Sequence, residues 1–189
     1  MISTGMLILS LLGGSRVAVD TGYPTVILVR HAEKASATES DPSLSEIGRA
    51  RAAVLDSTLK DVKLTAIIVT QYRRTAETAA LVAQRHHLTP IVVPIDPAKL
   101  DAHLAAVVQS ARQHDGVVLV VGHSNTVSRL AHAFGGPVMP DLCDTNYAAM
   151  FTVKWAGQSP TMSITHYGAV VEVAGSAACT GIITVSHLS

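Results

Sequence analysis

Short apolar runs rich in Val and Ile constrain the fold of this chain more than any other feature of its sequence. They occupy residues 25–29, 66–69, 91–93 and 117–121. Continuous β-branched runs of this length are typical of strands that are buried on both faces of a sheet. Between them, apolar residues recur at helical spacing within residues 47–58, 76–83 and 100–108. This alternation predicts an α/β fold, a three-layer αβα sandwich with a mostly parallel central sheet.

The pattern changes after Gly135, Gly136 and Pro137. Two further strand-like segments, residues 148–153 and 162–167, are separated by a short turn-forming stretch. We expect them to form a terminal hairpin that closes the sheet. The length of 189 residues suffices for one hydrophobic core. We therefore predict a single domain over residues 21–189.

The N-terminal segment is treated separately, because residues 6–12 form an apolar run that is too short to span a bilayer. With a small-residue site near Ala18, it resembles a secretory signal, although no Lys or Arg precedes it. We interpret residues 1–20 as a signal peptide or a disordered N-terminus. This predicts a periplasmic or secreted protein without stable membrane insertion; the alternative is a cytoplasmic protein. Cys143 and Cys179 form a disulfide in the first case and stay thiols in the second.

The charge balance and the absence of certain motifs exclude several classes of function. The chain has 14 Lys and Arg against 14 Asp and Glu and no long basic run, so nucleic acid is not an expected partner. It has no glycine-rich nucleotide-binding motif, and neither its cysteines nor its histidines have the spacing of metal ligands. We predict no metal and no cofactor, and we treat His103 and six other histidines as surface or hydrogen-bonded structural residues.

Polar side chains follow three of the four predicted strands, at the edge where ligands bind to open parallel sheets. Arg30 and His31 follow the first strand, Arg74 comes after the second along the chain, and His123 follows the fourth. Two imidazoles and several guanidiniums would thus meet in one crevice. Guanidiniums complement the oxygens of a phosphate dianion, and a neutral imidazole can attack its phosphorus.

Four motifs, in order along the chain, resemble those of the histidine phosphatase superfamily, which contains phosphoglycerate mutases, acid phosphatases and phytases. Residues 30–33 read Arg-His-Ala-Glu, similar to its Arg-His-Gly signature, with Ala32 in place of Gly. Residues 44–52 resemble its helix start with Arg51 at the usual Gln position, residues 70–79 resemble its arginine motif, and residues 120–123 resemble its second histidine strand. Ala32 is tolerable unless the backbone there needs a positive φ. The resemblance implies a phosphoglycerate mutase-like fold in a small member without a cap domain.

The resemblance also implies a role for each matching residue. His31 attacks the phosphoryl group and forms a phosphohistidine, which water hydrolyses. Arg30, Arg74 and His123 hold the phosphoryl oxygens, with Arg74 preferred over Arg73 for the catalytic arginine. His31 must be neutral to attack, and we expect the neighbouring guanidiniums to lower its pKa. This chemistry needs no metal.

The groups that contact the rest of the substrate are harder to assign. Ser124 stands where acid phosphatases and phytases of the superfamily have an Asp proton donor. We expect Asp96, after the third strand, to donate the proton instead, with Glu33 as an alternative that otherwise only orients its loop. Ser124 and Asn125 are candidates for phosphate binding, or else N-caps of the following helix.

Without a cap domain, we expect an open, shallow pocket that suits a phosphorylated small molecule or a phosphoprotein. The predicted function is a metal-independent phosphatase that acts on phosphomonoesters or protein-bound phosphate, phosphohistidine included. A phosphoglycerate mutase-type phosphotransferase is one alternative. An inactive module that binds a phosphorylated ligand on the same fold is another.

Overall fold

A six-stranded sheet lies at the centre of the computed structural model, which describes residues 23–156 and 159–169. In spatial order its strands are β3 (Ile91–Val92), β2 (Leu64–Val69), β4 (Val117–Gly122), β1 (Thr25–Arg30), β5 (Ala149–Ala156) and β6 (Ser159–His166). The first four of these run parallel to one another, and β5 and β6 are antiparallel to their neighbours. The predicted mostly parallel sheet and its terminal hairpin are confirmed.

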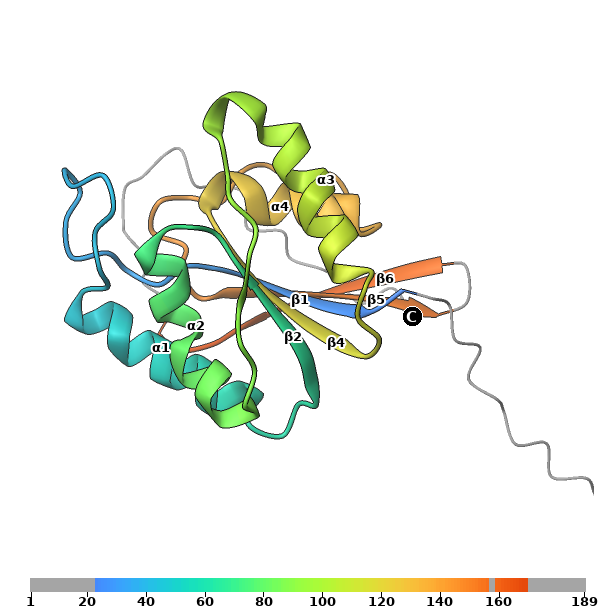
Figure 1. Cartoon of the computed structure of the whole chain (residues 1–189), viewed down its shortest axis with the longest axis horizontal. Coiled ribbons are helices and arrows are strands. Elements are labelled where there is room, and N and C mark those ends of the chain that lie inside the picture. The colour runs from blue at the N-terminus through green and yellow to red at the C-terminus, as the bar shows by residue number, and fades with distance from the viewer. Residues whose placement is uncertain (1–22, 157–158, 170–189) are drawn as a thin grey trace, which may run out of the picture.

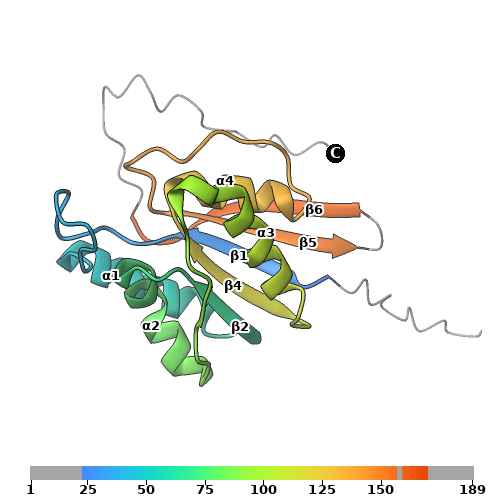
Figure 2. The same ribbon diagram turned by 45° about the horizontal axis from the view of Figure 1, so that its top comes forward.

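Helices cover both faces of the sheet, as Figures 1 and 2 show. The helices α1 (Glu46–Leu59) and α2 (Arg73–His86) lie on one face, and α3 (Leu100–Ala111) and α4 (Ser124–Ala133) lie on the other. A short 3-10 helix, η1 (Pro97–Lys99), precedes α3. The α/β fold with three layers is therefore confirmed.

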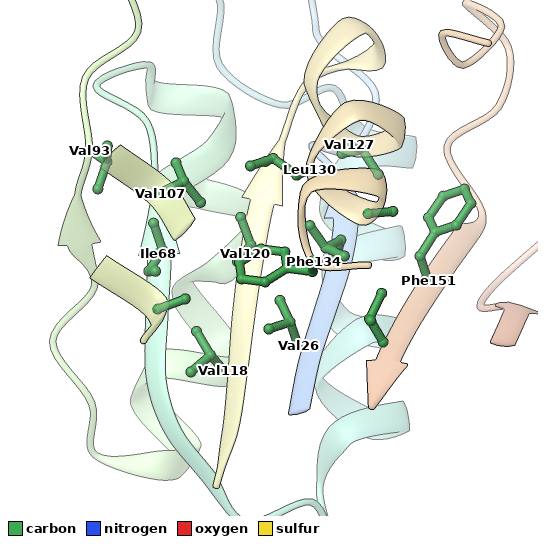
Figure 3. Close-up of a cluster of buried hydrophobic side chains, with 14 of the residues drawn as sticks. Val26, Ile68, Val93, Val107, Val118, Val120, Val127, Leu130, Phe134 and Phe151 are labelled. Atoms are coloured by element: carbon green, nitrogen blue, oxygen red, sulfur yellow. The ribbon is translucent and has the colours of Figure 1, made fainter. Parts of the chain in front are cut away.

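Alternate residues of each central strand enter one of two hydrophobic cores. Val118 and Val120 of β4 pack toward Leu130 of α4 on one face (Figure 3). On the other face, Leu119 and Val121 belong to the core under α1 and α2. Because both faces are covered, these strands read as continuous apolar runs rather than as alternating ones.

The apolar run at residues 91–93 does not form the central strand that we expected. The strand β3 has two residues and pairs at the edge of the sheet with β2. Val92 is 56% exposed there. Pro90 and Pro94, which lack the N–H group of a strand ladder, bracket the run and keep it short.

The helix α1 forms where helical spacing predicted it, but it buries a different face. Ile47 and Val54, two of the apolar residues that recur at helical spacing in residues 47–58, are exposed. Instead, the buried face carries the charged side chains of Arg51 and Asp56. Each has an ionic partner, Glu33 for Arg51 and Arg85 for Asp56. Buried charges are tolerated when they are paired, so apolar periodicity alone misassigned the face.

Two predictions fall wholly or partly outside the described residues. Residues 1–20 lie there, so the signal peptide and the cellular location stay predictions. Cys143 is not a free cysteine, but Cys179 also lies outside, so the predicted pairing is not tested. Within residues 23–156 and 159–169, no helix is long and apolar enough to cross a membrane.

Candidate active site

Two histidine rings meet at the carboxyl ends of the adjacent strands β1 and β4. The His31 N–H donates to the Gly122 carbonyl at 2.9 Å, which holds the two strand ends together. The ring centroids of His31 and His123 are 5.4 Å apart. Both residues are buried, with 4% and 7% of their surface exposed. The structure thus brings together the two histidines that the sequence placed in one crevice.

A backbone contact orients the His31 ring. Its Nδ1 lies 2.8 Å from the Ala32 carbonyl oxygen. A carbonyl only accepts, so Nδ1 carries the hydrogen and Nε2 of the neutral ring keeps a free lone pair. The Ala32 N–H in turn donates to the hydroxyl of Thr78 on α2. Among the described residues only His87 is a non-glycine residue with a positive φ, so alanine fits at position 32.

Both histidines are strongly shifted toward the neutral form. The pKa of His31 is lowered to about 3, chiefly by burial and to a lesser extent by the charges of Arg30, Arg74 and Lys34. The pKa of His123 is likewise lowered to about 3. Burial is the largest cause, and His31, Arg74 and Arg30 also contribute. The expected direction is confirmed, but burial is a larger cause than the guanidiniums that we held responsible.

This shift predicts that both rings stay neutral in moderately acidic solution. At pH 4.5 an ordinary histidine is only about 1% neutral, whereas these two should remain mostly neutral. We expect the imidazole nitrogen shifts of His31 and His123, assigned with His31→Ala and His123→Ala, to titrate below pH 4. Because the folded pKa lies below the unfolded one, both rings also lower the free energy of unfolding as the pH falls below about 6.5. A midpoint near 6.5 for either ring would contradict the buried geometry.

The His123 ring is fixed by groups from two elements. Its Nε2 lies 3.0 Å from the hydroxyl of Thr70, which follows β2. Its backbone N–H donates to the Thr126 hydroxyl at 2.8 Å, and His123 itself is the N-cap of α4. The expectation that Ser124 or Asn125 caps this helix is wrong, since both lie within its first turn. Ser124 is half-buried beside His123, and Asn125 is exposed.

Arg30 is buried beside the His31 ring, and one nitrogen of its guanidinium makes no hydrogen bond. Its Nη1 donates to the Cys143 carbonyl at 2.8 Å, and its Nη2 lies 3.6 Å from Asp144. The guanidinium stacks on Tyr147, 4.1 Å from the ring centroid. Its buried Nε has no partner within the described structure. An unpaired charged donor beside a neutral imidazole is suited to binding an oxyanion.

The two adjacent arginines at the start of α2 have different surroundings. The Arg74 side chain is 15% exposed, stacks 4.2 Å above the Tyr72 ring and lies 3.8 Å from Asp41. Its charge lowers the pKa of both histidines. The Arg73 side chain is 61% exposed and pairs with Glu77. The structure therefore places Arg74 at the histidine pair and Arg73 at the surface.

Glu33 points to a buried arginine instead of the histidine pair. Its carboxylate accepts hydrogen bonds from Nε and Nη2 of Arg51 at 2.7 to 3.0 Å. The same guanidinium donates to the carbonyls of Tyr167 and Ala169, after β6. Arg51 thus ties the loop after His31 to the end of the hairpin. This engagement supports the loop-orienting alternative for Glu33.

The other carboxyl candidate, Asp96, lies on a segment that is attached to the same edge. Gln71, after β2, makes two hydrogen bonds of 2.8 Å with the backbone of Ile95. Asp96 is exposed, and its carboxylate accepts the Ala98 N–H as the N-cap of η1. His103 is buried nearby and bonded to the Pro94 carbonyl, as expected of a structural histidine. The carboxyl group of Asp96 would have to leave its cap in order to donate a proton.

A close approach in α1 gives a stability prediction. A Cβ atom on Gly48 would overlap the carbonyl oxygen of Glu33, two residues after His31. In a helix, Gly→Ala ordinarily stabilises by about 0.5–1 kcal/mol. We expect Gly48→Ala instead to destabilise by about 1–3 kcal/mol and to lower activity, because the loop after His31 must shift. Chemical denaturation measures this, with Ala53→Gly as the helix-propensity control; a stabilised Gly48→Ala protein would contradict the packing.

Comparisons with known proteins agree with this geometry. Residues 26–95 match the family model of the histidine phosphatase superfamily, branch 1. No curated protein matches the sequence. Among solved structures, a mycobacterial glucosyl-3-phosphoglycerate phosphatase is 16% identical with a TM-score of 0.56 and covers 78% of this chain and 100% of its own. At TM-scores of 0.59, the protein histidine phosphatase SixA is 19% identical (75% and 96% covered), and a candidate α-ribazole-5′-phosphate phosphatase of Escherichia coli K-12 is 16% identical (80% and 99% covered). At identities this low, the structural similarity shows a shared fold and nothing more.

Proposed function

We propose that this chain, whose residues 26–95 match the model of the histidine phosphatase superfamily, hydrolyses phosphomonoesters, or phosphate bound to protein, through a phosphohistidine on His31. The observation that carries this proposal is the orientation of the His31 ring. Its Nδ1 hydrogen is held by the Ala32 carbonyl, which leaves the Nε2 lone pair as a nucleophile. Beside it lie a buried arginine with an unpartnered Nε, a second arginine and a second neutral histidine.

In the first step, Nε2 of His31 attacks phosphorus, and the bond from phosphorus to the leaving oxygen breaks. The electron pair of that bond departs with the oxygen, which then takes up a proton. The hydrogen on Nδ1 stays bonded to the Ala32 carbonyl and stabilises the positive charge of the phosphorylated ring. Arg30, Arg74 and His123 donate to the phosphoryl oxygens, where charge develops in the transition state.

In the second step, a water molecule attacks the phosphohistidine. The new oxygen–phosphorus bond forms as the nitrogen–phosphorus bond breaks, and the electron pair returns to Nε2 of His31. The water proton is released and inorganic phosphate leaves. We propose Asp96 as the group that protonates the leaving oxygen and later accepts the water proton, because Glu33 is held by Arg51.

The same site would also serve the two alternatives. A phosphoglycerate mutase-type phosphotransferase passes the phosphoryl group from the histidine to an alcohol, and a binding module stops at phosphate binding. The similar solved structures named above are of proteins described as phosphatases, which supports hydrolysis. The buried, neutral and free Nε2 of His31 supports catalysis over binding alone.

Hydrolysis of p-nitrophenyl phosphate in excess EDTA tests the proposal. We expect turnover that EDTA leaves intact and inorganic phosphate as the main product even with glycerol present. Predominant transfer to glycerol would favour the phosphotransferase. Binding of inorganic phosphate without turnover would favour the binding module.

We also propose that the protein is exported, on the strength of the apolar N-terminal run alone. N-terminal sequencing of the protein from its native cells tests this. A start near Val19 supports export, and a retained Met1 contradicts it.

A further inference from the structure

Four aromatic rings form a row across the edge of the sheet where the histidine pair lies. The centroid of Tyr72 is 5.5 Å from that of His123, His123 is 5.4 Å from His31, and His31 is 6.1 Å from Tyr147. Tyr72 follows β2, and Tyr147 precedes β5. The strand order β2-β4-β1-β5 therefore fixes the order of the rings.

Each of the two tyrosines stacks against an arginine of the site. Each ring has a guanidinium over one face, Arg74 over Tyr72 at 4.2 Å and Arg30 over Tyr147 at 4.1 Å. Both tyrosines are only half-buried. A phosphoryl group bound between the arginines would therefore hold its ester substituent within reach of one or both rings. Aromatic pairs at centroid separations of 4.5–7 Å are favourable beyond the area that they bury.

The charges around the histidine pair disfavour a second anionic group on the substrate. Three cations act on His31, namely Arg30, Arg74 and Lys34. Two carboxylates lie within 4 Å of the guanidiniums, Asp144 at 3.6 Å and Asp41 at 3.8 Å. The sum of these five charges is +1, and a phosphate dianion brings it to −1. A further carboxylate or phosphate on the substrate then meets an already negative site.

The position of the acid candidate also favours a leaving group that departs easily. Asp96 is exposed and its carboxylate caps η1. An alkoxide needs a proton as it leaves, whereas a phenolate is stable enough to leave with little help. An aryl ester is therefore the monoester that depends least on an acid that must first leave its cap.

Given the proposed phosphatase function, on which this inference rests, we propose that Tyr72 and Tyr147 make the site selective for phosphate monoesters of uncharged phenols. The two rings contact the aryl group, and Asp41 and Asp144 act against aryl groups that carry an additional negative charge. Tyr72 and Tyr147 are thus specificity-determining residues that act on the leaving group.

The test compares three substrates, phenyl phosphate, cyclohexyl phosphate and 4-carboxyphenyl phosphate, by kcat/KM. The phenyl-to-cyclohexyl ratio is compared between variants, so the intrinsic reactivity of each ester cancels. We expect Tyr72→Leu and Tyr147→Leu each to lower this ratio about five-fold. This is the change expected from the loss of one aromatic contact with the substrate. Tyr72→Phe and Tyr147→Phe keep the ring and should keep the ratio. Competitive inhibition by inorganic phosphate in each variant shows that the phosphate site is intact.

A separate measurement tests the role of the acidic side chains. Asp144, whose side chain is 98% exposed, can be changed with little risk to the fold. We expect Asp144→Asn to raise kcat/KM for 4-carboxyphenyl phosphate over phenyl phosphate about three-fold at low salt, and less at high salt. An unchanged phenyl-to-cyclohexyl ratio in the double Tyr→Leu variant overturns the inference and leaves the phosphatase proposal standing. If wild type hydrolyses none of the three esters, the phosphatase proposal itself fails.

Discussion

Replacing His31 by alanine is expected to lower kcat for phosphomonoester hydrolysis by at least about a thousandfold, since it removes the proposed nucleophile. Substrate and phosphate binding should suffer less, because Arg30 and Arg74 remain. The fold should persist, since the ring makes one hydrogen bond through Nδ1, to a neighbouring carbonyl. Steady-state kinetics with an aryl phosphate, alongside thermal unfolding of both proteins, measures the effect.

The matched control for this change is His166→Ala. His166 is exposed on the edge strand β6, which β5 separates from β1, and its removal should leave kcat within about two-fold. Added imidazole should restore part of the His31→Ala activity. A His31→Ala protein that keeps a tenth of wild-type kcat would contradict a nucleophilic role.

Arg74→Ala should be the second large loss, about a hundredfold or more in kcat/KM. Its guanidinium is largely shielded from water beside the two histidines. A fixed donor to a developing oxyanion is typically worth a factor of 10²–10³. Arg73→Ala removes the same side chain from the preceding position, where it is 61% exposed, and should change kcat/KM by less than about three-fold.

Comparing Arg74→Ala with Arg73→Ala separates the effect of where the guanidinium lies from the effect of its charge. Both variants lose one positive charge from the start of α2. Arg74→Lys is expected to recover only part of the loss, since an ammonium group cannot reproduce the two-pronged geometry of a guanidinium. Equal losses in Arg73→Ala and Arg74→Ala would show that general electrostatic attraction, and not a placed donor, accounts for the effect.

Most of the sheet could be predicted from the sequence because both of its faces are buried. Strands such as β1 and β4 have no solvent-facing side, so their apolar residues run on without interruption and are conspicuous. The residues just after these strands were equally predictable, since parallel strands must end at a common edge. His31, Arg30 and His123 were found in this way.

Features that depend on contacts between distant segments could not be predicted. The buried face of α1 includes Arg51 and Asp56, which look like surface residues until their partners Glu33 and Arg85 are placed beside them. The sequence also gives no measure of burial, so the pKa shift of His31 was assigned to arginines rather than to desolvation.

The two tyrosines were missed for different reasons. Tyr72 lies two residues before Arg74, inside a motif that was already recognised, and its position alone was a usable signal. Tyr147 precedes the antiparallel strand β5, and only the pairing of β5 with β1 brings it to His31. No local pattern marks such a residue.

The most direct test of the account is to trap the phosphorylated protein. The protein is mixed rapidly with an aryl phosphate, quenched in base, digested and mapped by mass spectrometry. We predict a phosphate that survives base, is lost in acid and lies on the peptide that contains His31. Turnover without a trapped phosphate on any histidine, or a phosphate carried by His123 in its place, would contradict it.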